Sequence, residues 1–447
     1  MKGWPIPGGV RACLDTLRRT GHAAYPVGGC VRDLLLGRTP GDWDVCTDAR
    51  PERVMELFPH TVPTGLRHGT VTVRTEDGPV EVTTFRREAG YADGRHPDAV
   101  DFDATLAEDL ARRDFTINAM AVCLNKARFG ELVDPFDGIG DLWEGIIRTP
   151  LDPDVTFSDD PLRMLRCVRF ATQLNFFIEE ETFEALSRNA ERIRIISGER
   201  IAEELCKIMA SQYPSKGFFE LQRCGLLGLI IPELTALDIV ETRNGRAHKN
   251  NFHHTLEVLE NVARAEERRY EQENPEQPPF KANIWLRWAA LFHDIGKPKS
   301  KRWDNQLGWT FHNHNDIGAR MVPEMFRRMK LPLDSKMKYV QKMVSLHMRP
   351  IVIADDVVTD SAVRRLLFEK AHQRRGRRHR RPHDALRGRH HEQEPGEEEA
   401  VFGELPHRQG EDSRPQGARL QASAAAGHRR QRNHGALPSE TVPRGGR

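Results

Sequence analysis

The stretch that decides the fold is "GRTPGDWDVCT", residues 37–47, in which Asp42 and Asp44 flank a single tryptophan. A turn rich in Gly and Pro precedes it and a β-branched, apolar run follows. Residues two apart on a strand point to the same face of a sheet, so the two carboxylates are predicted to lie side by side. Bare carboxylates that close repel each other unless a cation lies between them. Mg²⁺, which prefers oxygen ligands and substrate phosphates, is the predicted cation.

The residues around this stretch alternate between helical and strand patterns. Helices are predicted over 9–21 and 30–37, strands over 22–27 and 42–47, and a hairpin over 69–86. From about residue 141 to 369 strand signals fade and helical periodicity dominates. The layout predicts a small mixed α/β head followed by a long helical body.

A glycine pair, Gly28-Gly29, stands at the predicted junction between the first strand and the next helix. Backbone N–H groups and the helix dipole at such a junction favour a phosphate. An Asp-x-Asp pair alone is more often a solvated strand edge. Glycines and paired acids at this spacing favour nucleotidyl transfer by a two-metal arrangement.

Length and cysteine usage set the broad class. A chain of 447 residues is expected to form two to four domains. It has no apolar run long enough to cross a membrane, and the N-terminus lacks a secretory apolar segment. Seven cysteines without a C-x-x-C pair are typical of a reduced, cytoplasmic protein.

The last segment, residues 371–447, differs from the rest in composition. It holds 16 Arg, no Lys, eight of the 19 His, and no Ile, Met, Tyr, Trp or Cys. Disorder is one interpretation. The other interpretation is a segment translated out of frame. Possible codons for "RHRRPHD" (378–384) read "DIDDLMT" when shifted by one base, and two further stretches also give foldable sequences in the shifted frame. We interpret it as a disordered tail translated out of frame. Residues 1–370 then carry 51 basic and 55 acidic residues, so a polyanion would have to meet a local basic face.

Three motifs together resemble a known family. "VGGCVRDLLLGRTPGDWDVCT" (27–47), "RRDFTINAMA" (112–121) and "DDPLRMLRCVRF" (159–170) are similar to the class II, bacterial-type tRNA nucleotidyltransferase and poly(A) polymerase family. The resemblance implies an α+β fold with a head of DNA polymerase beta type, an all-α neck and a helical HD domain. The implied boundaries are 1–140 for the head, 141–235 for the neck with base selection and RNA binding, 236–370 for the HD domain and 371–447 for the tail.

The resemblance also implies residue roles in the head. Asp42 and Asp44 would be catalytic, bind Mg²⁺ and activate the RNA 3′-hydroxyl, with Glu81 as a third carboxylate. The remaining implied residues bind the nucleotide: Gly28, Gly29 and Arg32 (with Asp33 beside it), and Arg112, Arg113 and Asp114 at the ribose and triphosphate.

Base selection is implied for the segment Asp159-Asp160-Pro161-Leu162-Arg163, where the family usually has Glu at the first position. Asp160 and Arg163, spaced i and i+3 on a predicted helix, would offer an acceptor and donors to a base. An ordinary surface ion pair is the alternative for these two side chains.

A second constellation, His254 with His293-Asp294 in "FHDIGKP", resembles the HD metal-dependent phosphohydrolase superfamily. These residues would ligate a divalent metal of unknown identity, and His312, His314 and His347 could complete a two-metal site.

The predicted function is template-independent addition or repair of the 3′-terminal CCA of tRNA, with CTP, ATP and the tRNA 3′ end as partners, Mg²⁺ as cofactor and no membrane. Three alternatives stay open: an adenosine-only polymerase (a poly(A) polymerase or an A-adding enzyme), an HD-type phosphodiesterase or phosphatase, and an inactive frameshifted copy. The sequence leaves the oligomeric state undetermined.

Overall fold

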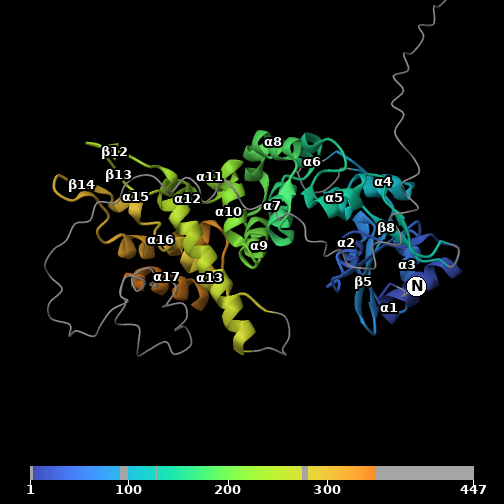
Figure 1. The fold of residues 1–447 in the computed structure, drawn as a ribbon. Helices are drawn as coiled ribbons and strands as arrows, with labels where there is room; N and C mark the ends of the chain where they lie inside the picture. Colours follow the sequence, from blue (N-terminus) through green and yellow to red (C-terminus); the bar gives the residue numbers. More distant parts are fainter. Residues whose placement is uncertain (1–3, 91–98, 126–127, 274–279, 349–447) are drawn as a thin grey trace, which may run out of the picture. The chain divides into compact units, whose positions relative to one another are not determined.

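The computed structural model describes residues 4–90, 99–125, 128–273 and 280–348 (Figure 1). Apart from Leu35–Arg38, these residues belong to one compact unit. The predicted out-of-frame tail, 371–447, lies outside the described residues.

The head contains the predicted mixed sheet. Its five strands run in the order β1-β2-β5-β4-β3. They are β1 (Ala24–Pro26), β2 (Trp43–Thr47), β3 (Thr61–Gly65), β4 (Thr70–Thr75) and β5 (Gly78–Thr84). β2 pairs with β5 in parallel, and the other neighbours are antiparallel. The β4–β5 hairpin is the one predicted from the alternating sequence.

Short helices and two-stranded pairs complete the head. They are α1 (Gly8–Arg19), α2 (Gly29–Leu35), α3 (Pro51–Leu57), α4 (Leu106–Ala111), β6 (Arg87–Ala89) with β7 (Ala99–Asp101), and β8 (Ala121–Cys123) with β9 (Glu131–Val133). α4 begins with a capping box, because the Thr105 hydroxyl accepts from the Glu108 N–H and the Glu108 carboxylate accepts from the Thr105 N–H. Val27, Cys46, Phe85 and Leu110 share the apolar core beneath the site.

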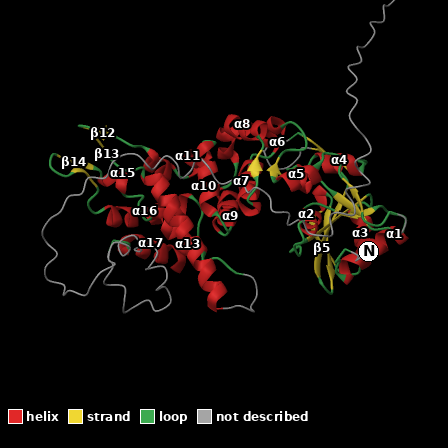
Figure 2. Cartoon of the chain, in the orientation of Figure 1, coloured by secondary structure: helices red, strands yellow, loops and turns green. Residues whose placement is uncertain are grey.

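The rest of the described chain is mainly helical, as predicted (Figure 2). Its helices are α5 (Gly138–Glu144), α6 (Pro153–Asp159), α7 (Leu162–Leu174), α8 (Glu180–Asn189), α9 (Gly198–Met209), α10 (Pro214–Arg223), α11 (Leu226–Ile230), α12 (Pro232–Thr235), α13 (Asn251–Glu273), α14 (Ile284–Phe292), α15 (Lys297–Ser300), α16 (His314–Arg328) and α17 (Ser335–Leu346). The α+β prediction is confirmed.

One detail corrects the all-α expectation for this region. Three short strand pairs occur there: β10 (Ile146–Ile147) with β11 (Phe177–Ile178), β12 (Thr242–Arg243) with β13 (Arg246–Ala247), and β14 (Arg302–Asp304) with β15 (Gly308–Thr310). Strands of two or three residues are too short to leave an alternating apolar pattern in the sequence.

A buried arginine joins three helices of this region. Arg287 on α14 is 1% exposed. Its Nη1 donates to the backbone carbonyls of Met209 (2.9 Å) and Ser211 (2.6 Å) at the end of α9, and its Nε donates to Glu266 on α13 (2.8 Å). Each hydrogen bond satisfies an otherwise buried polar group, so α9, α13 and α14 are held in one arrangement.

Within the described residues, the helices are all too short or too polar to cross a membrane.

Candidate functional sites in the head and the HD region

The head site begins with the predicted carboxylates. Asp44 lies on β2 and pairs in register with Glu81 on the neighbouring parallel strand β5. Asp42 directly precedes β2, two residues before Asp44, and is exposed. Alternation along β2 therefore directs all three carboxylates to one face of the sheet. The structure brings Glu81 to the place where a third carboxylate was predicted.

Burial raises the pKa of Asp44 to about 6, with Glu81 and Asp42 adding to the shift and Arg113 opposing it. The raised pKa of Asp44 beside two further acids shows that the ionised carboxylates lack enough positive charge to balance them. In the described chain, the groups of three metal-ligating atoms within 4.8 Å of one another lie elsewhere. The donor set fits Mg²⁺, which keeps several waters and binds through one or two carboxylates plus substrate phosphates.

The glycine pair lies between β1 and α2, as predicted, and the N–H of Gly28 is already engaged. Gly28 adopts φ +79°, and its N–H donates to the Met120 carbonyl (3.0 Å), so this N–H is not free for a phosphate. A Cβ at Gly28 would lie 2.9 Å from Arg113 Nη1 and 3.8 Å from Asp44 Oδ2. Glycine is needed here for the backbone conformation and for the close approach of Arg113.

Arg113 lies beside the site and has one donor without a partner. Its guanidinium pairs with Asp109 (3.2 Å), while its buried Nε has no hydrogen-bond partner. A buried N–H without a partner costs free energy, so Arg113 is incompletely satisfied beside Gly28 and Asp44. The triphosphate is the anion that fits a guanidinium beside a glycine turn.

The neighbouring residues of the Arg-Arg-Asp step are held by ion pairs. Arg112 contacts Asp109 (2.9 Å) and Glu88 (3.3 Å). Asp114 accepts from the Phe115 N–H (2.9 Å) and from Asn118 (3.1 Å). Its second oxygen accepts from Arg166 on α7 (2.8 Å). Burial alone would raise the pKa of Asp114, but Arg166 outweighs it and lowers the pKa to about 2.

Arg32 connects the glycine turn to this step. Its Nη1 donates to Asn118 Oδ1 (2.8 Å), and its Nε and Nη2 contact Asp33. Because Asn118 also donates to Asp114, an unbroken chain of polar contacts runs from α2 through Asp114 to Arg166 on α7.

The predicted base-selecting pair is near this network, but not in the predicted way. α6 ends at Asp159 and α7 begins at Leu162, so Asp160 lies between two helices rather than on one with Arg163. Asp160 pairs with Arg200 (3.2 Å), and its other oxygen accepts from the Leu162 N–H (3.1 Å). Pro161 at the junction breaks the helical spacing, because its ring disfavours a helical residue before it.

Arg163 reaches the Arg-Arg-Asp step instead of Asp160. Its Nη2 donates to the carbonyl of Arg112 (3.0 Å). The third motif therefore meets the second through a backbone contact between residues 51 positions apart.

Sequence reasoning missed three residues of this network: Arg166, Asn118 and Asp109. Within "RMLRCVRF" (163–170) only Arg163 was assigned a role from the sequence. Arg166 instead pairs with Asp114, and Arg169 is buried against Glu204 (2.5 Å). A buried Asp109 three and four residues before two arginines is a spacing that could have signalled the ion pairs.

The second site lies where the HD motif was predicted. His293 follows the last turn of α14, His314 begins α16, and His347 follows α17. Their Nε2 atoms lie 3.1, 3.3 and 3.8 Å from the carboxylate of Asp294, and His254 Nε2 on α13 lies 3.9 Å from it. Two groups of possible metal ligands share Asp294: one with His254 and His293, the other with His314 and His347.

The imidazole rings are oriented for this task. The Nδ1 atoms of His293, His314 and His347 face the carbonyls of Ala290 (2.8 Å), Phe311 (2.7 Å) and Val344 (2.7 Å). A carbonyl only accepts, so each Nδ1 donates, which leaves the Nε2 of each ring as the atom that would bind a metal. His314 Nε2 and His347 Nε2 lie 3.1 Å apart. Two lone pairs that close favour a shared cation.

The protonation state agrees with metal binding. Burial, reinforced by His293, lowers the pKa of His254 to about 4 and that of His347 to about 3, so both are neutral near pH 7. Lys297 Nζ lies 2.7 Å from Asp294 and supplies positive charge. The prediction that included His312 is not supported by position, because His312 is exposed and lies outside both groups.

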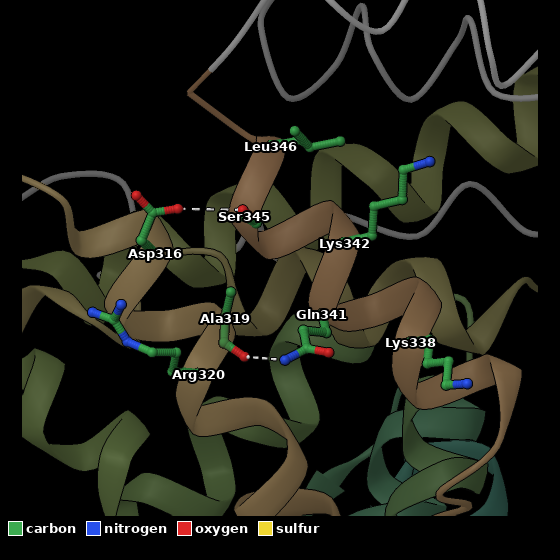
Figure 3. Close-up of a pocket in the computed structure, with 8 residues that line it drawn as sticks. All are labelled: Asp316, Ala319, Arg320, Lys338, Gln341, Lys342, Ser345 and Leu346. Carbon is green, nitrogen blue, oxygen red and sulfur yellow. Dashed lines mark hydrogen bonds between the residues drawn. The ribbon is translucent and has the colours of Figure 1, made fainter.

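A hollow of about 450 Å³ lies between α16 and α17 (Figure 3). Arg320, Lys338 and Lys342 line it, with Asp316 as its one acidic residue. Asp316 accepts from Ser345 (3.3 Å), whereas the three cations are exposed. The hollow therefore presents a local positive charge.

Comparison with known proteins adds a second line of evidence. Residues 24–148 match the poly A polymerase head domain, 175–237 the probable RNA and SrmB-binding site of polymerase A, and 251–426 the HD domain. The HD match extends past 370, the predicted end of that domain. The class is thus a nucleotidyltransferase-type head joined to an HD domain.

Individual relatives carry a consistent description. The CCA-adding enzyme of Levilactobacillus brevis is 46% identical over 217 residues, 48% of this chain and 54% of the relative. That of Lactobacillus helveticus is 50% identical over 205 residues, 46% of this chain and 50% of the relative. The chain thus spans about half the length of the curated relatives it matches.

A crystal structure of a tRNA nucleotidyltransferase with a primer tRNA and an incoming ATP analog has a TM-score of 0.57 and 22% identity, covering 81% of this chain and 95% of that one. At this identity the likeness concerns the fold. With the three domain matches in order, the chain belongs to the tRNA nucleotidyltransferase and poly(A) polymerase family with an HD domain.

Proposed function

We propose that the protein adds or repairs the 3′-terminal CCA of tRNA, using CTP and ATP. The observation that carries the proposal is the meeting of the three head motifs: Gly28 beside Arg113 and Asp44, and Arg163 against Arg112. The CCA-adding relatives support the choice of substrate. Location in the cytoplasm and the domain boundaries 1–140, 141–235 and 236–370 are part of the same proposal.

The chemistry assigns a task to each group. Asp42 and Asp44 would hold Mg²⁺, with Glu81 beside them, and Mg²⁺ would neutralise charge on the triphosphate and on the attacking 3′-oxygen. The acids also accept the proton of the RNA 3′-hydroxyl as its oxygen attacks the α-phosphorus and pyrophosphate leaves. Arg113, whose Nη1 lies beside Gly28, would bind the phosphates.

Ribose and base recognition fall to the remaining groups. Asp114, kept ionised by Arg166, is an acceptor for a ribose hydroxyl. Asp160 and Arg163 would leave their present partners, Arg200 and the Arg112 carbonyl, to contact the base.

The test uses purified protein, Mg²⁺ and three tRNA transcripts ending at the discriminator base, at C or at CC. CTP and ATP are supplied singly and together. Ordered addition of C, C and A, lost in Asp42→Ala, supports CCA addition. Incorporation of ATP alone indicates an adenosine-only polymerase. No incorporation, followed by activity of a frame-restored chain, identifies an inactive frameshifted copy.

We propose a second activity for the HD region, hydrolysis of a phosphoester at a divalent metal. The observation that favours it is the cluster of oriented histidines around Asp294 with Lys297 alongside. His254, His293, Asp294, His314 and His347 would hold the metal, which supplies a nucleophilic hydroxide when bound. Loss of phosphodiesterase activity in His293→Ala, with nucleotide incorporation retained, separates this activity from that of the head.

We infer that the hollow between α16 and α17 contacts the phosphate backbone of the tRNA. The exposed Arg320, Lys338 and Lys342 provide the local basic face that the acidic balance of residues 1–370 requires.

A further inference from the structure

Two small hairpins beside α15 form a surface that neither proposed activity uses (Figure 1). One is β12–β13 and the other is β14–β15, and β13 contacts β15. We call residues 241–249 and 301–311 the hairpin platform. Its side chains include five basic and only two acidic residues.

Aromatic rings form a continuous row across the hairpin platform. Trp303 and Trp309 are opposite each other in the β14–β15 register and meet edge-to-face, with centroids 5.3 Å apart and ring planes at 77°. His248 lies edge-on to Trp309 (5.7 Å) and to Phe311 (5.6 Å). The row therefore runs from Trp303 through Trp309 and His248 to Phe311.

Cations lie over the two tryptophan rings. The Arg243 guanidinium is 5.3 Å from the Trp303 centroid, and Lys301 Nζ is 5.3 Å from that of Trp309. Both tryptophans are only half-buried, and every residue of β12 and β13 is exposed. A packing core would bury these rings, so the arrangement is better suited to a ligand than to holding the hairpins together.

The row ends at the five possible metal ligands His254, His293, Asp294, His314 and His347, which we call the HD cluster. The Phe311 carbonyl accepts from His314 Nδ1 (2.7 Å), and Lys297 Nζ lies 5.7 Å from the Phe311 centroid. The same ammonium is 2.7 Å from Asp294. Phe311 and Lys297 therefore connect the aromatic row to the proposed metal ligands.

We propose that the hairpin platform binds the bases of a single-stranded RNA and directs a phosphate of that strand to the HD cluster. Aromatic faces interleaved with arginine and lysine are the means by which single strands are held without sequence specificity. The proposal rests on the HD activity proposed above for the fate of the phosphate, but base binding itself does not require hydrolysis.

The residues suggest how a base is received. Arg243 lies over Trp303 and Lys301 over Trp309 by cation–π attraction. Lys301 also pairs with Glu241 (2.6 Å), so the exposed Arg243 is the cation more easily displaced. A base stacks on a ring in place of the cation, and the displaced cation turns to the strand's phosphate. The indole of Trp309 keeps its orientation, because its Nε1 donates to the Arg246 carbonyl (3.2 Å).

The test is photocrosslinking of the full chain to a five-nucleotide RNA carrying 5-iodouridine, followed by mass spectrometry of the peptides. We expect crosslinks to the segment 301–311. Trp303→Leu should raise the RNA concentration for half-maximal crosslinking there about tenfold, the effect of losing one stacked base. Trp303→Phe should restore most of the affinity. Adenosine monophosphate should compete, whereas ribose 5-phosphate and inorganic phosphate should not.

Controls separate this inference from the other proposals. Trp143→Leu, which removes an exposed tryptophan of α5, should leave crosslinking unchanged. Arg243→Gln should weaken crosslinking by a few-fold. Because this variant keeps both tryptophans, its loss of affinity cannot be ascribed to misfolding of β14–β15. Crosslinks to the head without any to 301–311 overturn the inference while leaving CCA addition standing. Equal competition by ribose 5-phosphate would show binding by charge alone and overturn base recognition.

Discussion

The two candidate sites handle negative charge in opposite ways. In the head, Asp42, Asp44 and Glu81 share a sheet face, burial raises the pKa of Asp44, and the nearest cation, Arg113, is committed to Asp109. In the HD region one carboxylate, Asp294, is surrounded by histidines and Lys297. The comparison teaches that the HD cluster is preorganised for an ion alone, whereas the head carboxylates need an ion that arrives with a nucleotide.

The largest expected effect separates the two sites by activity. Asp44→Asn should lower CTP incorporation by about 10³-fold, because it removes a charge that acts directly on the reacting groups. The paired change His293→Ala with Asp294→Ala should leave incorporation within about twofold. Single-turnover incorporation on a tRNA ending at the discriminator base measures both. Equal losses would contradict the independence of the two sites.

Metal binding without nucleotide should stabilise the protein through the HD cluster only. A divalent ion at 100 times its Kd raises the free energy of unfolding by about 2.7 kcal/mol. Thermal unfolding with and without chelator, scanning Mn²⁺, Zn²⁺ and Mg²⁺, detects the gain. His314→Gln should abolish it and Asp44→Asn should leave it intact. If the metal-induced stabilisation were lost in Asp44→Asn, the ion would bind at the head and not at the HD cluster, which would contradict the comparison.

Arg166→Met should lower the free energy of unfolding of the head by about 2 kcal/mol, because Asp114 then stays buried and charged without its partner. The pKa of Asp114 is lowered to about 2, so its stabilising contribution is complete above pH 4 and is lost as the pH falls towards 2. The difference between wild type and variant should therefore shrink between pH 4 and pH 2.

Urea midpoints across this pH range provide the check. Arg192→Met, which removes an exposed arginine, serves as the control. A difference that is constant with pH would show that Arg166 acts through packing alone.

The smallest expected effect concerns RNA affinity. Lys338→Ala with Lys342→Ala should weaken tRNA binding several-fold and reduce the slope of log K against log salt by about 1.8, the value for two phosphate contacts. Lys336→Ala, on the same helix but with its ammonium 5.4 Å from the Trp285 ring centroid, is the matched control. An unchanged slope would remove the α16–α17 hollow from the tRNA surface.

Much of the fold was predictable because its signals are local. The alternating hairpin, the Asp-x-Asp strand and the glycine-to-helix turn each depend on neighbours within a few residues. The short strand pairs β10–β15 were missed because their pairing is decided by packing, not by pattern.

The sites were predictable as residue types but not as contacts. Asp44 and Glu81 meet because β2 and β5 are parallel neighbours, which no local signal fixes. Arg166 was given no role from the sequence because its partner, Asp114, lies 52 residues away. Asp160 was placed on a helix because the effect of Pro161 was not given its weight.

The buried guanidinium of Arg287 affects the order in which parts of the chain can fold during synthesis. Ribosomes release residues 198–211 well before Arg287, yet the carbonyls of Met209 and Ser211 depend on that arginine for their donors. Until α14 emerges, the end of α9 must stay hydrated or find a substitute partner, because unpaired carbonyls are costly to bury. The end of α9 therefore acquires its final form only after α14 has been synthesised, and an interrupted product ending near residue 235 would keep that end open.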